Sequence, residues 1–126
     1  MRTLLSFLLA LSLSSPSQAS NWMRIDETRN HAIYYLDVDG VRPWKAYKSA
    51  WLKIDRSRDN TFSYDHSIDM WLVDCARRSL ALKSSHSYSA DGAIIRSDDF
   101  DEYDLKWQAA VPESVGETIL DRTCAL

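Results

Sequence analysis

Apolar and polar positions alternate along most of the chain after residue 20, and this pattern predicts a β-rich domain. Successive side chains of a strand point to opposite faces of a sheet, so a two-residue repeat gathers the apolar set on one face. The segments that carry the pattern are 22–27, 31–37, 47–55, 66–75, 79–88, 93–97 and 105–111. Their succession with short connections favours one meander-like antiparallel sheet.

Segment 66–75 is predicted to lie in the middle of that sheet. Apolar side chains occupy both its odd and its even positions, so both of its faces should be covered. Asp91-Gly92 is the strongest hairpin-turn signal in the chain. Pro43 lacks a backbone N–H, and we expect it to keep the residues that follow it out of regular strand pairing.

The last part of the chain changes to a helical pattern. Ser114 is followed three residues later by Glu117, which fits a capping box at a helix start. The apolar face of this helix would consist of Val115, Ile119, Leu120 and Cys124. The predicted fold class is therefore α+β, with a single, mostly antiparallel sheet of six to seven strands and one C-terminal helix.

The first residues have the composition of an export signal. Arg2 precedes an apolar run of roughly ten residues, which is too short for a membrane span, and Pro16 ends it. Ser17-Gln18-Ala19 offers small residues at a cleavage site, so we expect residues 1–19 to be removed. No cysteine follows the cut, and the sequence thus predicts a periplasmic or secreted protein without a lipid anchor or a transmembrane segment.

Residues 20–126 are enough for one hydrophobic core and too few for two, so we expect a single domain there. The whole chain has a formal net charge of −3, which becomes −4 when Arg2 is removed with the signal. This mildly acidic balance gives no general attraction to nucleic acid, and we exclude nucleic acid as a partner. The sequence leaves open whether the domain is a monomer or a homodimer.

Cys75 and Cys124 are the only cysteines, and export through an oxidising compartment predicts that they form a disulfide. Closing a loop of this length should stabilise the fold by roughly 4 kcal/mol. A metal pair or a reactive thiol would be the other interpretation. Neither cysteine belongs to a CxxC motif or has a histidine close by, so we expect no metal site there.

The landmarks of the chain, taken in order, resemble those of the surface-adhesin protein E family. They are Trp22, Tyr34, Tyr35, Asp37, Trp51-Leu52-Lys53, Val73-Asp74-Cys75, Tyr88, Gly92, Trp107, Pro112-Glu113-Ser114 and Cys124. The resemblance implies an antiparallel sheet with a C-terminal helix fastened by Cys75 and Cys124. It also implies a binding role, since the best-known member is a lipid-anchored adhesin that binds host extracellular-matrix proteins.

A basic and aromatic segment, residues 42–58, is the candidate ligand-binding feature. Six cations in it oppose one acid, and the candidate binding residues are Arg42, Trp44, Lys45, Tyr47 and Lys48. Cations interleaved with aromatics can bind an acidic protein segment or an acidic glycan. The same segment also fits a solvated edge strand whose lysines oppose aggregation.

The acidic run at residues 98–104 has two interpretations, which are a solvated loop and a calcium site. The motifs GxSxG and the P-loop are absent, and we expect no cofactor and no catalytic residues. The leading hypothesis is an exported, non-catalytic binding module for a host or envelope protein or glycan. The alternative is a periplasmic inhibitor of a secreted hydrolase such as lysozyme, and a small hydrolase with paired carboxylates is a third possibility.

Overall fold

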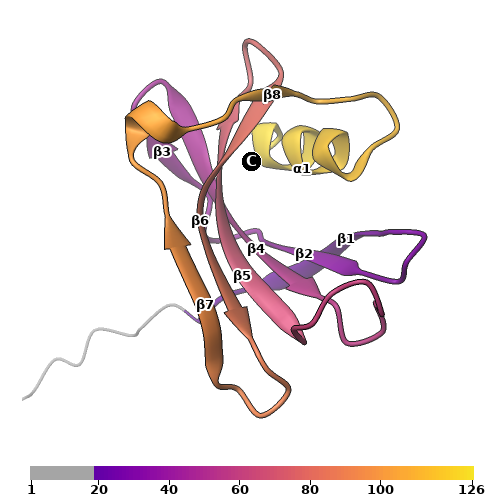
Figure 1. Cartoon of the computed structure of the whole chain (residues 1–126). Helices are drawn as coiled ribbons and strands as arrows, with labels where there is room; N and C mark the ends of the chain where they lie inside the picture. Colours follow the sequence, from indigo (N-terminus) through magenta and orange to yellow (C-terminus); the bar gives the residue numbers. More distant parts are fainter. Residues whose placement is uncertain (1–18) are drawn as a thin grey trace, which may run out of the picture.

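The computed structural model describes residues 19–126 (Figure 1). The predicted export signal lies outside the described residues, except for Ala19. The elements are, in order, β1 (Trp22–Glu27), β2 (Ile33–Asp37), β3 (Arg42–Trp44), β4 (Tyr47–Asp55), β5 (His66–Asp74), β6 (Ser79–Tyr88), β7 (Ile94–Asp99), the 3-10 helix η1 (Glu102–Asp104), β8 (Gln108–Ala109) and α1 (Val115–Cys124).

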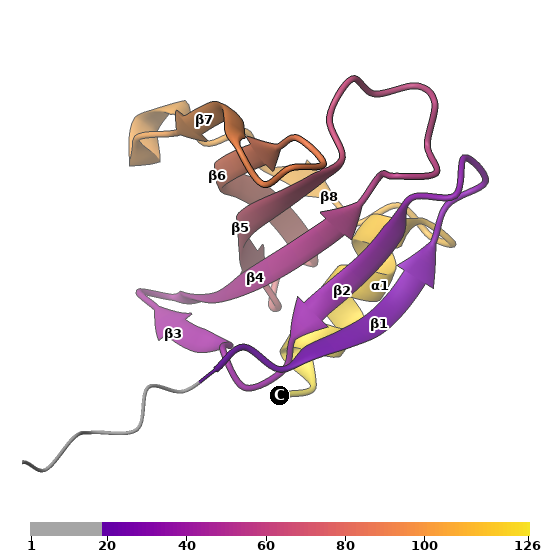
Figure 2. The same cartoon turned by 90° about the horizontal axis from the view of Figure 1, so that it is seen from below.

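The strands form one antiparallel sheet in the order β1-β2-β4-β5-β6-β7, which is a meander. Two short strands add to it, because β3 pairs with the beginning of β4 and β8 pairs with the beginning of β6. Figures 1 and 2 show that the sheet is curled and that α1 lies on one of its faces. The predicted α+β class and the meander are thus confirmed.

The main hydrophobic core lies between α1 and the sheet face that the helix covers. Alternate residues of β4, Ala50 and Leu52, are fully buried there, and they pack with Ile119 and Leu120 of the helix. Burying a side chain of the size of leucine stabilises a fold by about 1.5–3 kcal/mol. The helix therefore covers the core, and without it the sheet would expose a large apolar face to solvent.

The opposite face of the sheet has a smaller apolar cluster. Leu72 of β5 and Ala81 of β6 are fully buried and are paired across the two strands. They alternate with Val73 and Leu80, which belong to the core under the helix. The central strand β5 is consequently covered on both faces, as the continuous apolar pattern of residues 66–75 predicted.

Helix α1 starts as the capping pattern predicted. The Oγ of Ser114 accepts a hydrogen bond from the backbone N–H of Glu117 at 3.2 Å. The carboxylate of Glu117 accepts a bond from the backbone N–H of Glu113 at 3.3 Å, one residue before the cap. An N-cap of this type stabilises a helix by about 1 kcal/mol.

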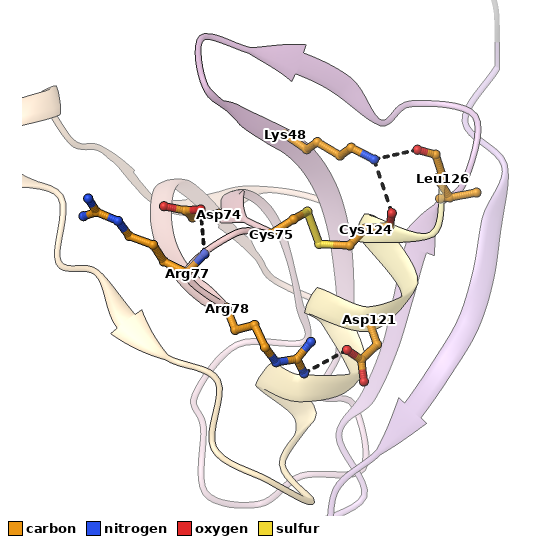
Figure 3. Close-up of a disulfide and its surroundings, with 8 residues drawn as sticks. All are labelled: Lys48, Asp74, Cys75, Arg77, Arg78, Asp121, Cys124 and Leu126. Carbon is orange, nitrogen blue, oxygen red and sulfur yellow. Dashed lines mark hydrogen bonds and ion pairs between the residues drawn. A yellow bond between two sulfur atoms is a disulfide. The ribbon is translucent and has the colours of Figure 1, made fainter.

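The disulfide joins the end of β5 to the end of the helix. Cys75 directly follows β5 and Cys124 is the last residue of α1, and their Cα atoms are 5.8 Å apart. Figure 3 shows a second connection nearby, where Arg78 donates to Asp121 of the helix at 3.0 Å. The predicted pairing is confirmed, and it holds the helix on the sheet.

Two local predictions were wrong. Arg42–Trp44 does form a strand, with Pro43 opposite Lys48. It is tolerated because β3 is a short edge strand, where a missing N–H can face solvent. In the predicted strand 105–111 only Gln108 and Ala109 pair with β6. The residues before them cross over the sheet and pack their side chains against the β3–β4 hairpin.

Candidate functional site

The predicted binding residues gather at the tip of the β3–β4 hairpin. Trp44 and Tyr47 are the last paired residues, so Lys45 and Ala46 form a two-residue turn. Lys45 has φ 54°, a left-handed backbone conformation that usually requires glycine. Non-glycine residues in this conformation cost energy and are held in place by their surroundings, often at functional sites.

The side chain of Lys45 contacts both an aromatic ring and an acidic side chain. Its Nζ lies 5.0 Å from the centroid of the Trp44 ring and forms an ion pair with Glu102 of η1. The Lys45 and Glu102 side chains are 59% and 50% exposed. Ion pairs that are this exposed contribute little stability and can exchange partners readily.

Tyr47 fixes the segment between β7 and β8 against the hairpin. Its ring lies 4.7 Å from that of Trp107, at an interplanar angle of 51°. Trp44, Lys45 and Tyr47 face Glu102 and Trp107 across a small hollow of about 200 Å³. The tip therefore presents a cluster of aromatic rings beside a cation, which is an arrangement that suits a ligand with both apolar and anionic parts.

On its other side the hairpin borders a larger hollow of about 400 Å³. Arg42, Lys45, Tyr47 and Lys48 line this hollow together with Leu126 at the chain end. Figure 3 shows the Nζ of Lys48 reaching the backbone oxygen of Leu126, at a distance of 2.7 Å. Four of the five predicted residues thus meet at one concave surface, which we name the basic hollow.

Backbone oxygens accept hydrogen bonds from two cations of the basic hollow. Arg42 donates from Nη1 to the carbonyls of Asp39 at 2.8 Å and of Val41 at 2.9 Å. Lys48 also lies 3.4 Å from the carbonyl oxygen of Cys124. These contacts help to position the side chains of Arg42 and Lys48 at the hollow.

The basic segment does not form one continuous surface. Arg56 turns inward, its side chain is 12% exposed, and it pairs with the buried Asp59 at 3.2 Å. Its guanidinium also lies 3.8 Å from the centroid of the Phe62 ring. Arg56 therefore organises the loop after β4 and does not add to the surface charge of the hairpin.

The acidic run at residues 98–104 is largely engaged with cations of the same chain. Asp98 pairs with Arg96 at 2.8 Å, and Asp99 pairs with Lys83 at 2.6 Å. Glu102 is the acid that pairs with Lys45 at the hairpin tip. In the described part of the chain, no three or more His, Cys, Asp or Glu side chains are placed to hold a metal ion.

The central strand β5 carries one of the buried carboxylates of the fold. Asp69 of β5 is 6% exposed and accepts a hydrogen bond from the Oγ of Ser85 at 2.6 Å. Burial raises the pKa of Asp69, and the hydrogen bonds from Ser85 and Ser67 oppose that rise. The hollow beside the hairpin tip has only one acid, Glu102, so it does not supply the paired carboxylates that a hydrolase would need.

Sequence reasoning missed the two partners that η1 and the segment after it bring to the site. Glu102 is 57 residues from Lys45 in the chain, and Trp107 was assigned to a regular strand. The acidic run was identified, but nothing local in the sequence shows which cation it meets. The tight β3–β4 turn could not be predicted from the sequence either, because it lacks the glycine or asparagine that such turns usually contain.

The protein is thus a disulfide-linked β domain whose β3–β4 hairpin has aromatic and basic residues at its tip. The chain belongs to the surface-adhesin protein E family, whose model matches residues 22–125. A search of curated proteins and a search of solved structures gave no match. Membership in this family indicates an adhesin-like binding protein rather than an enzyme, as the sequence resemblance implied.

The family and the disulfide also indicate an exported protein. Among the described residues, no helix combines the length and the apolar character that crossing a membrane requires. Removal of residues 1–19 remains a prediction, because the proposed signal lies outside the described residues.

Proposed function

We propose that the protein is an exported, non-catalytic binding module that captures an acidic protein segment or an acidic glycan on its β3–β4 hairpin. The observation that carries this proposal is the convergence of Arg42, Lys45, Tyr47 and Lys48 on the basic hollow. Positive charge attracts the ligand over a distance, and the aromatic rings supply contact area once it has docked.

The present partners of the two lysines do not block such a ligand. Glu102 is half exposed and held by a solvent-screened ion pair, so a ligand carboxylate or sulfate can take its place beside Lys45. Lys48 donates to backbone oxygens and can bond an additional acceptor, since an ammonium group has three donors.

The alternative function, inhibition of a secreted hydrolase, has less support. An inhibitor that plugs an active-site cleft would need a protruding loop with available acids. Asp98 and Asp99 of the acidic run lie in strand β7 and pair with Arg96 and Lys83, so these two acids do not project on a loop. A binding surface at the hairpin uses the features that the fold presents to solvent, and we therefore favour it.

The test is a charge reversal at the hairpin. The triple variant Arg42→Glu, Lys45→Glu, Lys48→Glu should fold and should lose binding to immobilised heparin or matrix protein in surface plasmon resonance at low salt. Wild-type binding should itself weaken as salt rises, because screening shortens the reach of the hairpin charges.

The matched control reverses three cations far from the hairpin. Arg29→Glu, Arg58→Glu, Arg96→Glu changes the net charge by the same amount, and all three residues are exposed. This variant should keep most of the binding. If both triple variants lose binding equally, the interaction depends on net charge alone and the hairpin proposal is wrong.

A further inference from the structure

A separate cleft of about 710 Å³ lies beside the segment between β7 and β8. Trp71 and Leu82 of the sheet form one wall, and Phe100, Tyr103 and Leu105 form the other. This volume falls within the range of pockets that hold small organic ligands. Apart from Leu105, its residues do not line the hollow at the hairpin tip, so it is a different site.

The aromatic residues of this cleft are partly or fully exposed to solvent. Tyr103 is fully exposed, at 100% of its reference area, and Phe100 and Trp71 are half-buried. An aromatic ring that packs against nothing in its own fold gains no core stabilisation. Together the three rings offer flat apolar surfaces to a ligand in the cleft.

The polar groups of the cleft point to a neutral ligand. They are one acid, one base and one amide, namely Asp104, Lys106 and Gln108. The two charges cancel, so there is no preference for an ion of either sign. Each group can donate to or accept from a hydroxyl, and this mixed set complements a ligand that has many hydroxyl groups.

Trp71 forms part of the inner wall of the cleft, with one edge of its indole buried in the fold. Its indole Nε1 is buried and has no hydrogen-bond partner among the described residues. A buried donor without a partner costs about 1–3 kcal/mol, and such groups in native proteins require an explanation. Trp71 also lines a hollow of about 250 Å³ at the start of α1, so its ring separates two open spaces.

We infer that this cleft binds a neutral sugar of one or two pyranose rings. A pyranose has an apolar face of C–H groups, which stacks on an aromatic ring, and a rim of hydroxyls, which suits Asp104, Lys106 and Gln108. The fully exposed Tyr103 is the stacking platform. The site is independent of the basic hollow, which takes the acidic ligand of the proposed function.

The indole N–H signals of the ¹⁵N-labelled protein test this inference directly. The chain has 5 tryptophans, and the signal of Trp71 can be assigned with a Trp71→Phe variant. Titration with cellobiose or diacetylchitobiose should shift the Trp71 signal and leave those of Trp22 and Trp51 in place. A shift confined to Trp44 would place the sugar at the hairpin and overturn the inference.

Variants of Tyr103 provide the matched comparison. Tyr103→Ala should weaken sugar binding at least about tenfold, because it removes the platform from an exposed position without disturbing the core. Tyr103→Phe keeps the ring and should keep the binding. Equal binding by the alanine variant and the wild type, or no shift with either disaccharide, would refute the sugar site. Shifts of Trp71 with a peptide or protein only would assign the cleft to a different class of partner.

Discussion

Lys45 combines a backbone conformation that disfavours lysine with a side chain at the centre of the proposed binding site. Its φ of 54° is held by the two-residue turn between β3 and β4. Since glycine adopts this conformation without steric cost, the turn sequence is not the most stable one available. The lysine side chain at this position contacts Trp44 and Glu102 at the hairpin tip.

This strain can be measured. Lys45→Gly should be more stable than Lys45→Ala by about 1 kcal/mol in chemical denaturation, because both lack the ammonium and only glycine relieves the strain. The neighbouring Ala46, whose φ is not positive, gives the control. Ala46→Gly should lower stability by roughly 0.5–1 kcal/mol. Equal stability of the two Lys45 variants would show that the turn is unstrained.

Asp69 gives a prediction for the dependence of stability on pH. Burial raises its pKa in the folded state above the ordinary value of 3.8, so the folded protein binds the proton more tightly than the unfolded chain does. Its contribution therefore favours folding at low pH and becomes unfavourable as the pH rises through the folded-state pKa.

The corresponding variant is Asp69→Asn, which keeps an acceptor for Ser85 and cannot ionise. It should be more stable than the wild type at neutral pH, and the difference should shrink as the pH falls towards the ordinary aspartate range. Denaturation curves over a pH series measure the difference. A constant difference at every pH would show that Asp69 does not titrate with an elevated pKa in the fold.

At the scale of elements, the long strands could be predicted from the sequence and the short ones could not. The bounds of β1, β4 and β6 agree with the predicted segments, because five or more alternating positions specify a strand and its faces. β3 and β8 are only three and two residues long. They form because the tertiary fold places them beside the beginnings of β4 and β6. Their own sequences are too short to predict a strand.

The segment between η1 and β8 shows the same limit of sequence-based prediction at the candidate site. Alternating apolar residues at 105–111 fit a strand, but Leu105 and Trp107 instead contact the hairpin or line the hollows beside it. The proximity of the five hairpin residues could be predicted because they are neighbours in the sequence. Their partners Glu102 and Trp107 could not, since the curl of the sheet determines which segment lies over them.

The disulfide is the element-scale contact with the largest expected effect. The double variant Cys75→Ser, Cys124→Ser should lose about 2–5 kcal/mol of stability, because it frees the unfolded chain and releases the helix that covers the core. Reducing agent should destabilise the wild type by a similar amount and leave the double variant unchanged. Wild-type stability that is insensitive to reduction would contradict this account.

At the scale of the whole molecule, the basic segment 42–58 and the acidic run 98–104 are not separate surfaces. The acidic run and the basic segment meet at the pair of Lys45 and Glu102, and Arg56 is withdrawn from the surface. The ion pairs of Lys45 with Glu102 and of Arg56 with Asp59 weaken the long-range field of the basic segment. Recognition at the hairpin must depend on local geometry and aromatic contact as well as on steering.

Export is also a property of the whole chain. We expect the protein isolated from the cell envelope or medium to begin at Ser20, because the small residues before it form a cleavage site. Intact-mass spectrometry measures this end directly. A mass that includes Met1, or a protein found only in the cytoplasm, would contradict the predicted signal.

The central claim is that the β3–β4 hairpin is the surface that binds an acidic ligand. Hydrogen exchange of the protein with and without bound heparin, read by mass spectrometry, tests it without any substitution. Peptides that contain residues 42–48 and 102–107 should exchange more slowly in the complex, and the β1–β2 turn should be unchanged. Protection confined to β7 or to the β1–β2 turn, with the hairpin unaffected, would show that the ligand binds elsewhere.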